Sequence, residues 1–173
     1  MGYLGETFDI HAGGSDLMFP HHENEIAQSR CGTDGDFARV WLHCAHLIVD
    51  GTKMSKSIGN VVTLEELIEA GHDPVVIRYL LSSVHYRRQL NYTADALEQA
   101  EASIARLRDF LLRVESSLPG MPRLDPDGSS ALAAALDRAQ TGFRQAIDDD
   151  LNTAGALGQM FTLVRDANSA LDS

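Results

Sequence analysis

Residues 8–25 read FDIHAGGSDLMFPHHENE, a stretch that joins three kinds of local pattern. Residues 8–11 are partly apolar and run into the small residues 12–14, as a short buried strand ending at a glycine turn would. Residues 21–30 follow Pro20 without a helix breaker and contain good helix formers, which predicts a helix. Strand, glycine turn and helix in that order indicate an α/β arrangement.

The α/β pattern continues as far as residue 62. Residues 46–49 read HLIV, which predicts a second short strand. A polar, lysine-rich loop over residues 50–60 follows this strand. We therefore expect residues 1–62 to form an α/β unit.

From residue 63 onward the sequence predicts only helices. Thr63 and Glu66 fit a capping box, and Asp73 followed by Pro74 fits an N-cap and a first helical position. Three later segments repeat apolar residues at spacings of three and four, which predicts three helices packed as a bundle, with residues 118–128 as a linker. Packing alone explains these apolar stripes, so we interpret them as core. The stripes consist of Leu97, Ala100, Ile104, Leu107, Leu111 and Val114; Leu132, Leu136, Ala139, Phe143 and Ala146; and Leu157, Met160, Val164, Ala167 and Leu171.

The composition is that of a folded chain without membrane spans. Of the 173 residues, 44% are apolar, which suffices for one ordinary domain or two small ones. No apolar run approaches the roughly 20 residues of a membrane-spanning helix, and the start does not resemble a signal peptide. Cys31 and Cys44 form no CxxC pair, so nothing indicates a secreted disulfide framework. We expect a cytoplasmic protein with no membrane partner.

The charge is acidic but unevenly distributed. A formal net charge of −11 argues against binding nucleic acid by bulk electrostatics. Three arginines, Arg78, Arg87 and Arg88, nevertheless lie around His85 and Tyr86. They could make a local contact with nucleic acid, or they could form the solvated end of a helix, which is the commoner outcome.

Residues 53–57 read KMSKS and form the most specific motif in the chain. Lys53 and Lys56 flank small hydroxyl residues on a loop after a strand, where they could close over a triphosphate. Their charges would then neutralise the charge that builds on the β- and γ-phosphates as pyrophosphate leaves. The alternative is an ordinary exposed polar loop.

A histidine–carboxylate pair opens the first predicted helix. His21 and Glu25 are four residues apart and share one helix face, whereas we expect His22 and Glu23 to point elsewhere. An imidazole nitrogen and a carboxylate oxygen are sound zinc ligands, but a closed tetrahedral site needs two more. The alternative is a hydrogen-bonded pair of polar residues on the helix surface.

The glycine turn before this helix is a candidate nucleotide site. Gly13 and Gly14 would let a ligand approach the backbone closely, and Asp16 could hydrogen-bond a ribose hydroxyl. His11 either lines the same cleft or is simply the polar end of the strand, and the sequence leaves both interpretations open.

Residues 8–29, followed in the same order by residues 53–60 and 85–92, closely resemble the cysteinyl-tRNA synthetases. The resemblance is dense to about residue 115 and looser but collinear beyond it. Members of that family activate cysteine with ATP to cysteinyl-adenylate and then transfer cysteine to the 3′ end of tRNA. The resemblance therefore implies L-cysteine, ATP with Mg²⁺ and tRNA(Cys) as substrates and partners.

The resemblance also implies an order of structural parts: an α/β region followed by an all-α region. Residues 1–62 would be the second half of a Rossmann-type catalytic domain that ends with the KMSKS loop. A stem-contact helical segment over residues 63–92 and a helical bundle over residues 93–173 would follow.

Individual roles follow from the same resemblance. Lys53 and Lys56 would be catalytic and hold the phosphates, Lys56 being the family's ATP-contacting lysine. His21 and Glu25 would be two of four zinc ligands; the other two are cysteines outside this chain. Zinc would bind the substrate thiolate and so discriminate against serine, whose hydroxyl ligates zinc less well. The residues implied to contact ATP or the adenylate are His11, Gly13, Gly14, Asp16, Lys53, Met54, Ser55, Lys56 and Ser57.

Two parts of the family pattern lie outside this sequence, namely the HIGH motif and the segments with the zinc-binding cysteines. We therefore expect the isolated chain to be inactive, with the absent N-terminal half as a candidate partner. One alternative is the related ligase of mycothiol synthesis, which joins cysteine to an amino sugar, although residues 24–25 and 85–92 look like the tRNA enzyme. Another alternative is a binding module without catalysis.

Overall fold

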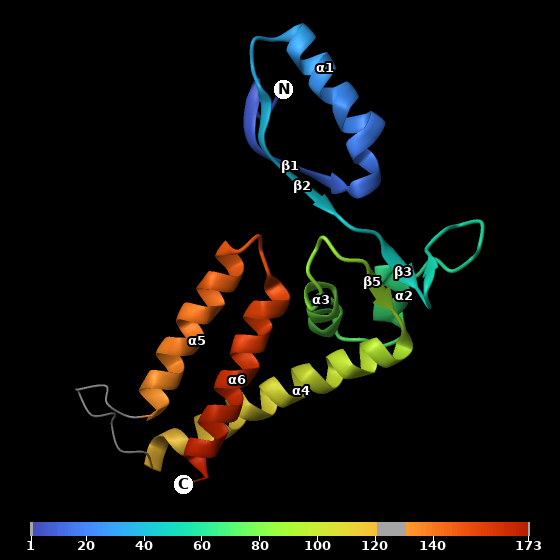
Figure 1. Cartoon of the computed structure of the whole chain (residues 1–173). Coiled ribbons are helices and arrows are strands. Elements are labelled where there is room, and N and C mark those ends of the chain that lie inside the picture. The colour runs from blue at the N-terminus through green and yellow to red at the C-terminus, as the bar shows by residue number, and fades with distance from the viewer. Residues whose placement is uncertain (1, 121–130, 173) are drawn as a thin grey trace.

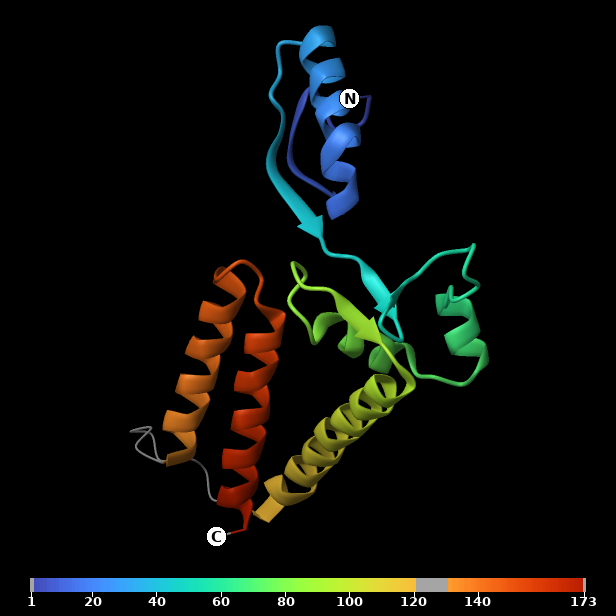
Figure 2. The same ribbon diagram turned by 45° about the vertical axis from the view of Figure 1, so that its right-hand side comes forward.

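A computed structural model describes residues 2–120 and 131–172 of the protein. The molecule is elongated, with an N-terminal α/β unit standing at one end (Figure 1). A small sheet with two helices lies in the middle of the molecule. The long helices α4 (Ala94–Ser117), α5 (Ala131–Asp148) and α6 (Thr153–Leu171) occupy the other end (Figure 2). The predicted fold class, α/β followed by all-α, is confirmed.

The N-terminal unit consists of two parallel strands and the crossover between them. In-register pairing runs from Thr7 opposite Phe37 to Gly14 opposite Cys44, and parallel strands require such a crossover connection. The elements are β1 (Thr7–Gly14), a 3-10 turn (Ser15–Leu17), a π-helical turn (Met18–His22), α1 (Glu23–Gly32) and β2 (Phe37–Cys44). The predicted first strand and helix are confirmed. The strand continues through the glycines that were predicted as a turn, because these glycines pair with β2. The strand β2 itself was not predicted from the sequence.

Among the residues that the structure describes, only one face of this two-stranded sheet is covered, by α1 (Figure 1). Ile10 and Val40 are direct partners across the strands, and they are 63% and 55% exposed, respectively. Their sequence neighbours His11 and Trp41 are also direct partners and, by the alternation of strand side chains, lie on the opposite face. Parallel sheets are normally buried on both faces, so the Ile10–Val40 face is an apolar surface without a partner in the described chain.

The middle of the molecule contains a second, three-stranded sheet. Its strands are β3 (Leu47–Val49), β4 (Thr52–Lys53) and β5 (Leu90–Tyr92). β3 is central, antiparallel to β4 and parallel to β5. The prediction of a strand over 46–49 is confirmed, whereas the prediction of helices alone after residue 63 is wrong at β5. The expected division at residues 62 and 92 stays a prediction.

Both predicted helix starts in the middle region are confirmed. Thr63 and Glu66 form a complete capping box at the start of α2 (Leu64–Glu69). Asp73 caps α3 (Pro74–Ser82) by accepting a hydrogen bond from the backbone amide of Val75 at 2.8 Å. The main apolar core lies between α3 and the first half of α4 (Ala94–Ser117), and its buried members are Val76, Leu80, Leu97, Ala100 and Ile104.

The three predicted long helices are present, but they do not pack equally. α5 (Ala131–Asp148) and α6 (Thr153–Leu171) lie side by side as an antiparallel hairpin in both views (Figures 1 and 2). α4 packs first on α3 and meets α6 along its second half, where Arg106 Cζ lies 6.0 Å from the centroid of the Phe161 ring and Arg113 hydrogen-bonds Asn168 at 2.8 Å. Leu111, expected in the bundle core, is consequently 59% exposed.

The predicted linker begins as a 3-10 turn at Leu118–Gly120, and the rest of it lies outside the described residues. Within residues 2–120 and 131–172, no helix is both long and apolar enough to span a bilayer.

Candidate active site

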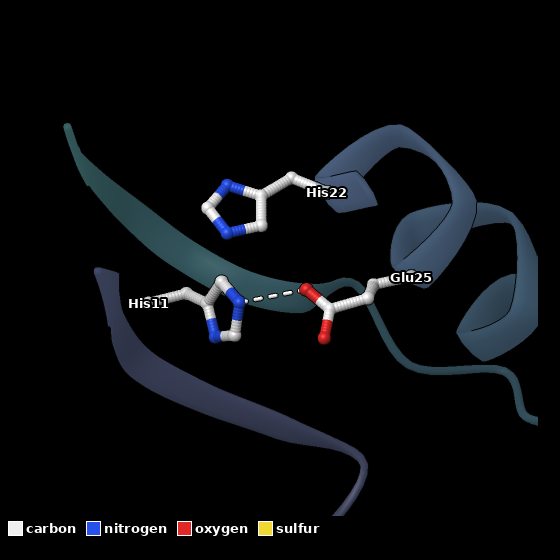
Figure 3. Close-up of side chains that lie close together, drawn as sticks. All are labelled: His11, His22 and Glu25. Carbon is white, nitrogen blue, oxygen red and sulfur yellow. Dashed lines mark hydrogen bonds and ion pairs between the residues drawn. The ribbon is translucent and has the colours of Figure 1, made fainter. Parts of the chain in front are cut away.

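A cluster of imidazoles and one carboxylate lies between α1 and the covered face of the β1–β2 sheet. His11 comes from β1, His22 from the end of the π-helical turn and Glu25 from the first turn of α1. Their candidate ligand atoms all lie within 4.8 Å of one another. Figure 3 shows the three side chains converging, with His11 Nε2 2.8 Å from Glu25 Oε2.

Aromatic rings enclose this cluster. The ring centroid of Trp41 lies 4.9 Å from that of His11 and 5.0 Å from that of His22. His22 is only 3% exposed, and its Nδ1 lies 2.8 Å from Nε2 of His43. Burial, with a smaller contribution from His11, lowers the pKa of His22, so the ring is neutral near pH 7. A neutral imidazole is the form that can bind a metal ion.

The predicted pairing of His21 with Glu25 is found, although it is the more exposed part of the cluster. His21 Nε2 lies 3.5 Å from Glu25 Oε1, and the His21 side chain is 59% exposed. The expectation that His22 points away from Glu25 is wrong. Residues three apart also share a helix face, and His22, at the end of the π-helical turn, lies close to Glu25 and against Trp41 and His43 of β2.

His22, Trp41 and His43 lie at the site without having been predicted there from the sequence. His22 could have been found from its three-residue spacing to Glu25. Trp41 and His43 belong to β2, whose recognition was necessary before its alternate residues could be assigned to the covered face.

Gly13 and Gly14, predicted as a turn but found at the end of β1, are required here for lack of space. A Cβ added to Gly13 would lie 2.8 Å from Cε1 of His22, and one added to Gly14 would lie 2.5 Å from Oδ1 of Asp16. Both contacts are too short for real atoms, so the glycines make room for His22 and Asp16. Close approach of a nucleotide, the role expected from sequence, stays a prediction.

The predicted lysine loop contains β4, which ends at Lys53, and the remainder over residues 54–60 projects from the middle of the molecule (Figure 1). Asn60 holds it closed: its side-chain oxygen accepts from the Ser55 amide at 2.9 Å, and its side-chain nitrogen donates to the Lys53 carbonyl at 3.3 Å. Lys53 and Lys56 are exposed, and neither has an ion-pair partner among the described residues. Both ammonium groups are therefore free to meet a charged ligand.

The basic cluster around Tyr86 is tied to the helical end of the molecule. Asp150, between α5 and α6, accepts a hydrogen bond from Tyr86 Oη and another from Arg87 Nε, each at 2.5 Å. The Arg87 hydrogen bond, followed by that of Tyr86, lowers the pKa of Asp150 to about 2. Arg87 therefore forms an ion pair, whereas one interpretation of the sequence placed it at the solvated end of a helix. A cavity of about 560 Å³ lies beside this link and is lined by Ser83, Val84, His85, Arg87, Arg88, Asn152 and Ala154.

The sequence matches a known family over most of the parts just described. A model of the catalytic domain of class I (C) tRNA synthetases matches residues 1–102, more than half of the chain. The chain belongs to this family. A model of the DALR domain matches residues 142–173, which include α6. The predicted resemblance to cysteinyl-tRNA synthetases is confirmed.

Curated relatives agree with the family match. The cysteine–tRNA ligases of Solibacter usitatus and Koribacter versatilis are 53% and 51% identical to the chain over 171 and 173 residues. These alignments cover 99% and 100% of this chain but only 36% and 34% of the relatives. The chain thus spans about a third of the length of these relatives.

Solved structures show the same fold at lower identity. A Mycobacterium tuberculosis methionyl-tRNA synthetase in complex with methionyl-adenylate is 24% identical, with a TM-score of 0.75, over 94% of this chain and 33% of its own. The Agrobacterium radiobacter LeuRS, in a ternary complex with tRNA and LeuAMS, is 15% identical, with a TM-score of 0.74, over 93% of this chain and 23% of its own.

Proposed function

We propose that the chain is part of a cysteine–tRNA ligase, which activates cysteine with ATP and transfers it to tRNA(Cys). The observation that carries the proposal is the convergence of His11, His22 and Glu25 on the covered face of the sheet, in a chain whose first 102 residues match the class I catalytic domain. The relatives named above are cysteine–tRNA ligases. Their names do not favour the two alternatives, a cysteine ligase of mycothiol synthesis and a binding module without catalysis.

The residues of the cluster fit a partial zinc site. Imidazole nitrogens and a carboxylate oxygen are typical zinc ligands, and Glu25 lies within reach of both His11 and His21. We propose His21 and Glu25 as ligands, with His22 and Trp41 as the enclosing wall. Bound zinc would supply selection for a thiolate over a hydroxyl. Cys31 and Cys44 are exposed and lie outside the cluster, so they do not complete the site.

The lysine loop would act on ATP, which we expect to arrive with Mg²⁺. Lys53 and Lys56 are exposed and without ion-pair partners among the described residues, so their charges are available to the β- and γ-phosphates. The Asn60 hydrogen bonds give the loop a defined shape, and Gly59 supplies the positive φ of 75° that its final turn requires. We propose that Gly13 and Gly14, at the end of β1, and Asp16 hold the nucleoside.

The exposed Ile10–Val40 face indicates that the isolated chain lacks part of the catalytic domain. In a class I catalytic domain, we propose, this face is covered by another part of the enzyme, which would also supply the cysteine ligands of zinc. The isolated chain is therefore expected to be inactive in cysteine-dependent ATP–pyrophosphate exchange. Location in the cytoplasm stays a prediction.

The test uses the full-length protein and two neighbouring glutamates of α1. Glu25→Gln is expected to lower cysteine-dependent ATP–pyrophosphate exchange by at least about tenfold and to reduce the zinc content of the purified protein. Glu23→Gln is the matched control, because Glu23 is exposed and is not part of the cluster. Equal exchange rates and equal zinc contents in the two variants would contradict the proposed site.

A further inference from the structure

Two polar side chains outside the histidine cluster meet where β1 and β2 end. Asp16 lies in the 3-10 turn that follows β1, and His46 lies in the two-residue connection between β2 and β3. Because Gly14 and Cys44 are in register at the ends of the parallel strands, the segments that follow them start side by side. His46 Nε2 is 3.9 Å from Asp16 Oδ1.

Both residues stand on well-anchored backbone. The carboxylate of Asp16 packs over Gly14 so closely that any added side chain there would collide with it. His46 is fixed on both sides, since the amide of Ala45 donates to the carbonyl of Tyr86 at 2.7 Å and Leu47 pairs with Leu90 in the second sheet. The backbone at the ends of the two sheets therefore fixes the positions from which the Asp16 and His46 side chains face each other.

The contact contributes little to stability as an ion pair. The side chains of His46 and Asp16 are 33% and 58% exposed, and 3.9 Å is too long for a direct hydrogen bond. The spacing instead suits a hydroxyl group placed between them. Such a hydroxyl can donate its proton to the carboxylate and accept a hydrogen bond from the Nε2–H of His46. Ligands of α/β folds bind beyond the carboxyl ends of parallel strands, which is where this pair lies.

From this geometry we infer that His46 binds a ribose hydroxyl of ATP together with Asp16. The inference rests on the proposed function and adds to it a nucleotide-binding residue that the KMSKS and glycine-turn motifs do not contain. His46 holds the nucleoside and takes no part in phosphate chemistry. Its loss should therefore raise KM for ATP and leave kcat nearly unchanged.

The test measures cysteine-dependent ATP–pyrophosphate exchange by the full-length protein with ATP, 2′-deoxy-ATP and 3′-deoxy-ATP. His46→Ala is expected to raise KM for ATP about fivefold, the effect of losing one hydrogen bond. With the deoxynucleotide that lacks the bound hydroxyl, the wild type and His46→Ala should have the same KM. His46→Gln retains an N–H donor and should restore much of the affinity for ATP.

A histidine elsewhere in the chain serves as the control. His72 hydrogen-bonds Glu101 at 2.8 Å in the middle region, so His72→Ala should leave KM for ATP unchanged. The inference is overturned if His46→Ala raises KM equally with ATP and both deoxynucleotides, or if it leaves KM for ATP unchanged. Absence of any cysteine-dependent exchange by the wild-type protein would overturn the proposed function itself and this inference with it.

Discussion

Leu97→Ala is expected to lower the free energy of unfolding by about 3 kcal/mol. Leu97 is only 3% exposed and packs in the cluster formed with Val76, Leu80, Ala100 and Ile104. The substitution removes about three buried carbon atoms, worth roughly 0.8 kcal/mol each in transfer free energy. The cavity that remains adds to this loss, and measured Leu-to-Ala changes in cores fall between about 2 and 5 kcal/mol.

The same helix supplies a matched control. Leu112 is 64% exposed, so Leu112→Ala is expected to change the free energy of unfolding by no more than about 0.5 kcal/mol. Both variants would be compared with the wild type by urea unfolding, followed by far-UV circular dichroism, with the m-values checked for equality. Equal losses in the two variants, or a loss below about 1 kcal/mol for Leu97→Ala, would refute packing of α4 on α3.

The remaining predictions concern one ion pair and one helix cap. Because the pKa of Asp150 is lowered from its usual 3.8 to about 2 in the folded chain, its contribution to stability is present above about pH 4 and is lost as the pH falls from 3.8 toward 2. Urea midpoints of the wild type and Asp150→Asn should therefore differ at pH 6 and converge near pH 2; a constant difference would count against the link to Arg87. Thr93 accepts a hydrogen bond from the Ala96 amide at 3.0 Å at the start of α4, so Thr93→Ala should lower stability by about 1 kcal/mol. Ser103→Ala, within the same helix, should have a smaller effect in the same urea assay, and the reverse order would exclude the cap.

Local signals in the sequence were reliable where the deciding contacts are a few residues apart. The capping box at Thr63 and the N-cap at Asp73 involve atoms within three residues of each other, and both are found as expected. The pairing of His21 with Glu25 is also found as expected, because residues four apart share a helix face. Each of these features is present in a single helical turn, and no distant part of the chain is needed to form it.

Features that depend on distant partners were missed or misplaced. β2 and β5 are strands because β1 and β3 pair with them across about 30 and 40 residues, which no local pattern reveals. The first strand extends through Gly13 and Gly14 for the same reason. The apolar stripe of α4 was correctly recognised, but its buried first half packs on α3 rather than in a bundle with α5 and α6, because a stripe specifies which face is buried and not what covers it.

The sequence by itself determined the family, the order of α/β and helical parts, and the candidate ligands His21 and Glu25, because motifs and periodicity are properties of neighbouring residues. Only the tertiary structure brought His11, His22 and Glu25 together and placed Asp16 opposite His46. The histidine cluster requires α1 to pack against β1, and the Asp16–His46 contact requires β1 and β2 to end in register. Both depend on hydrogen bonds and packing between segments that are not neighbours in the sequence.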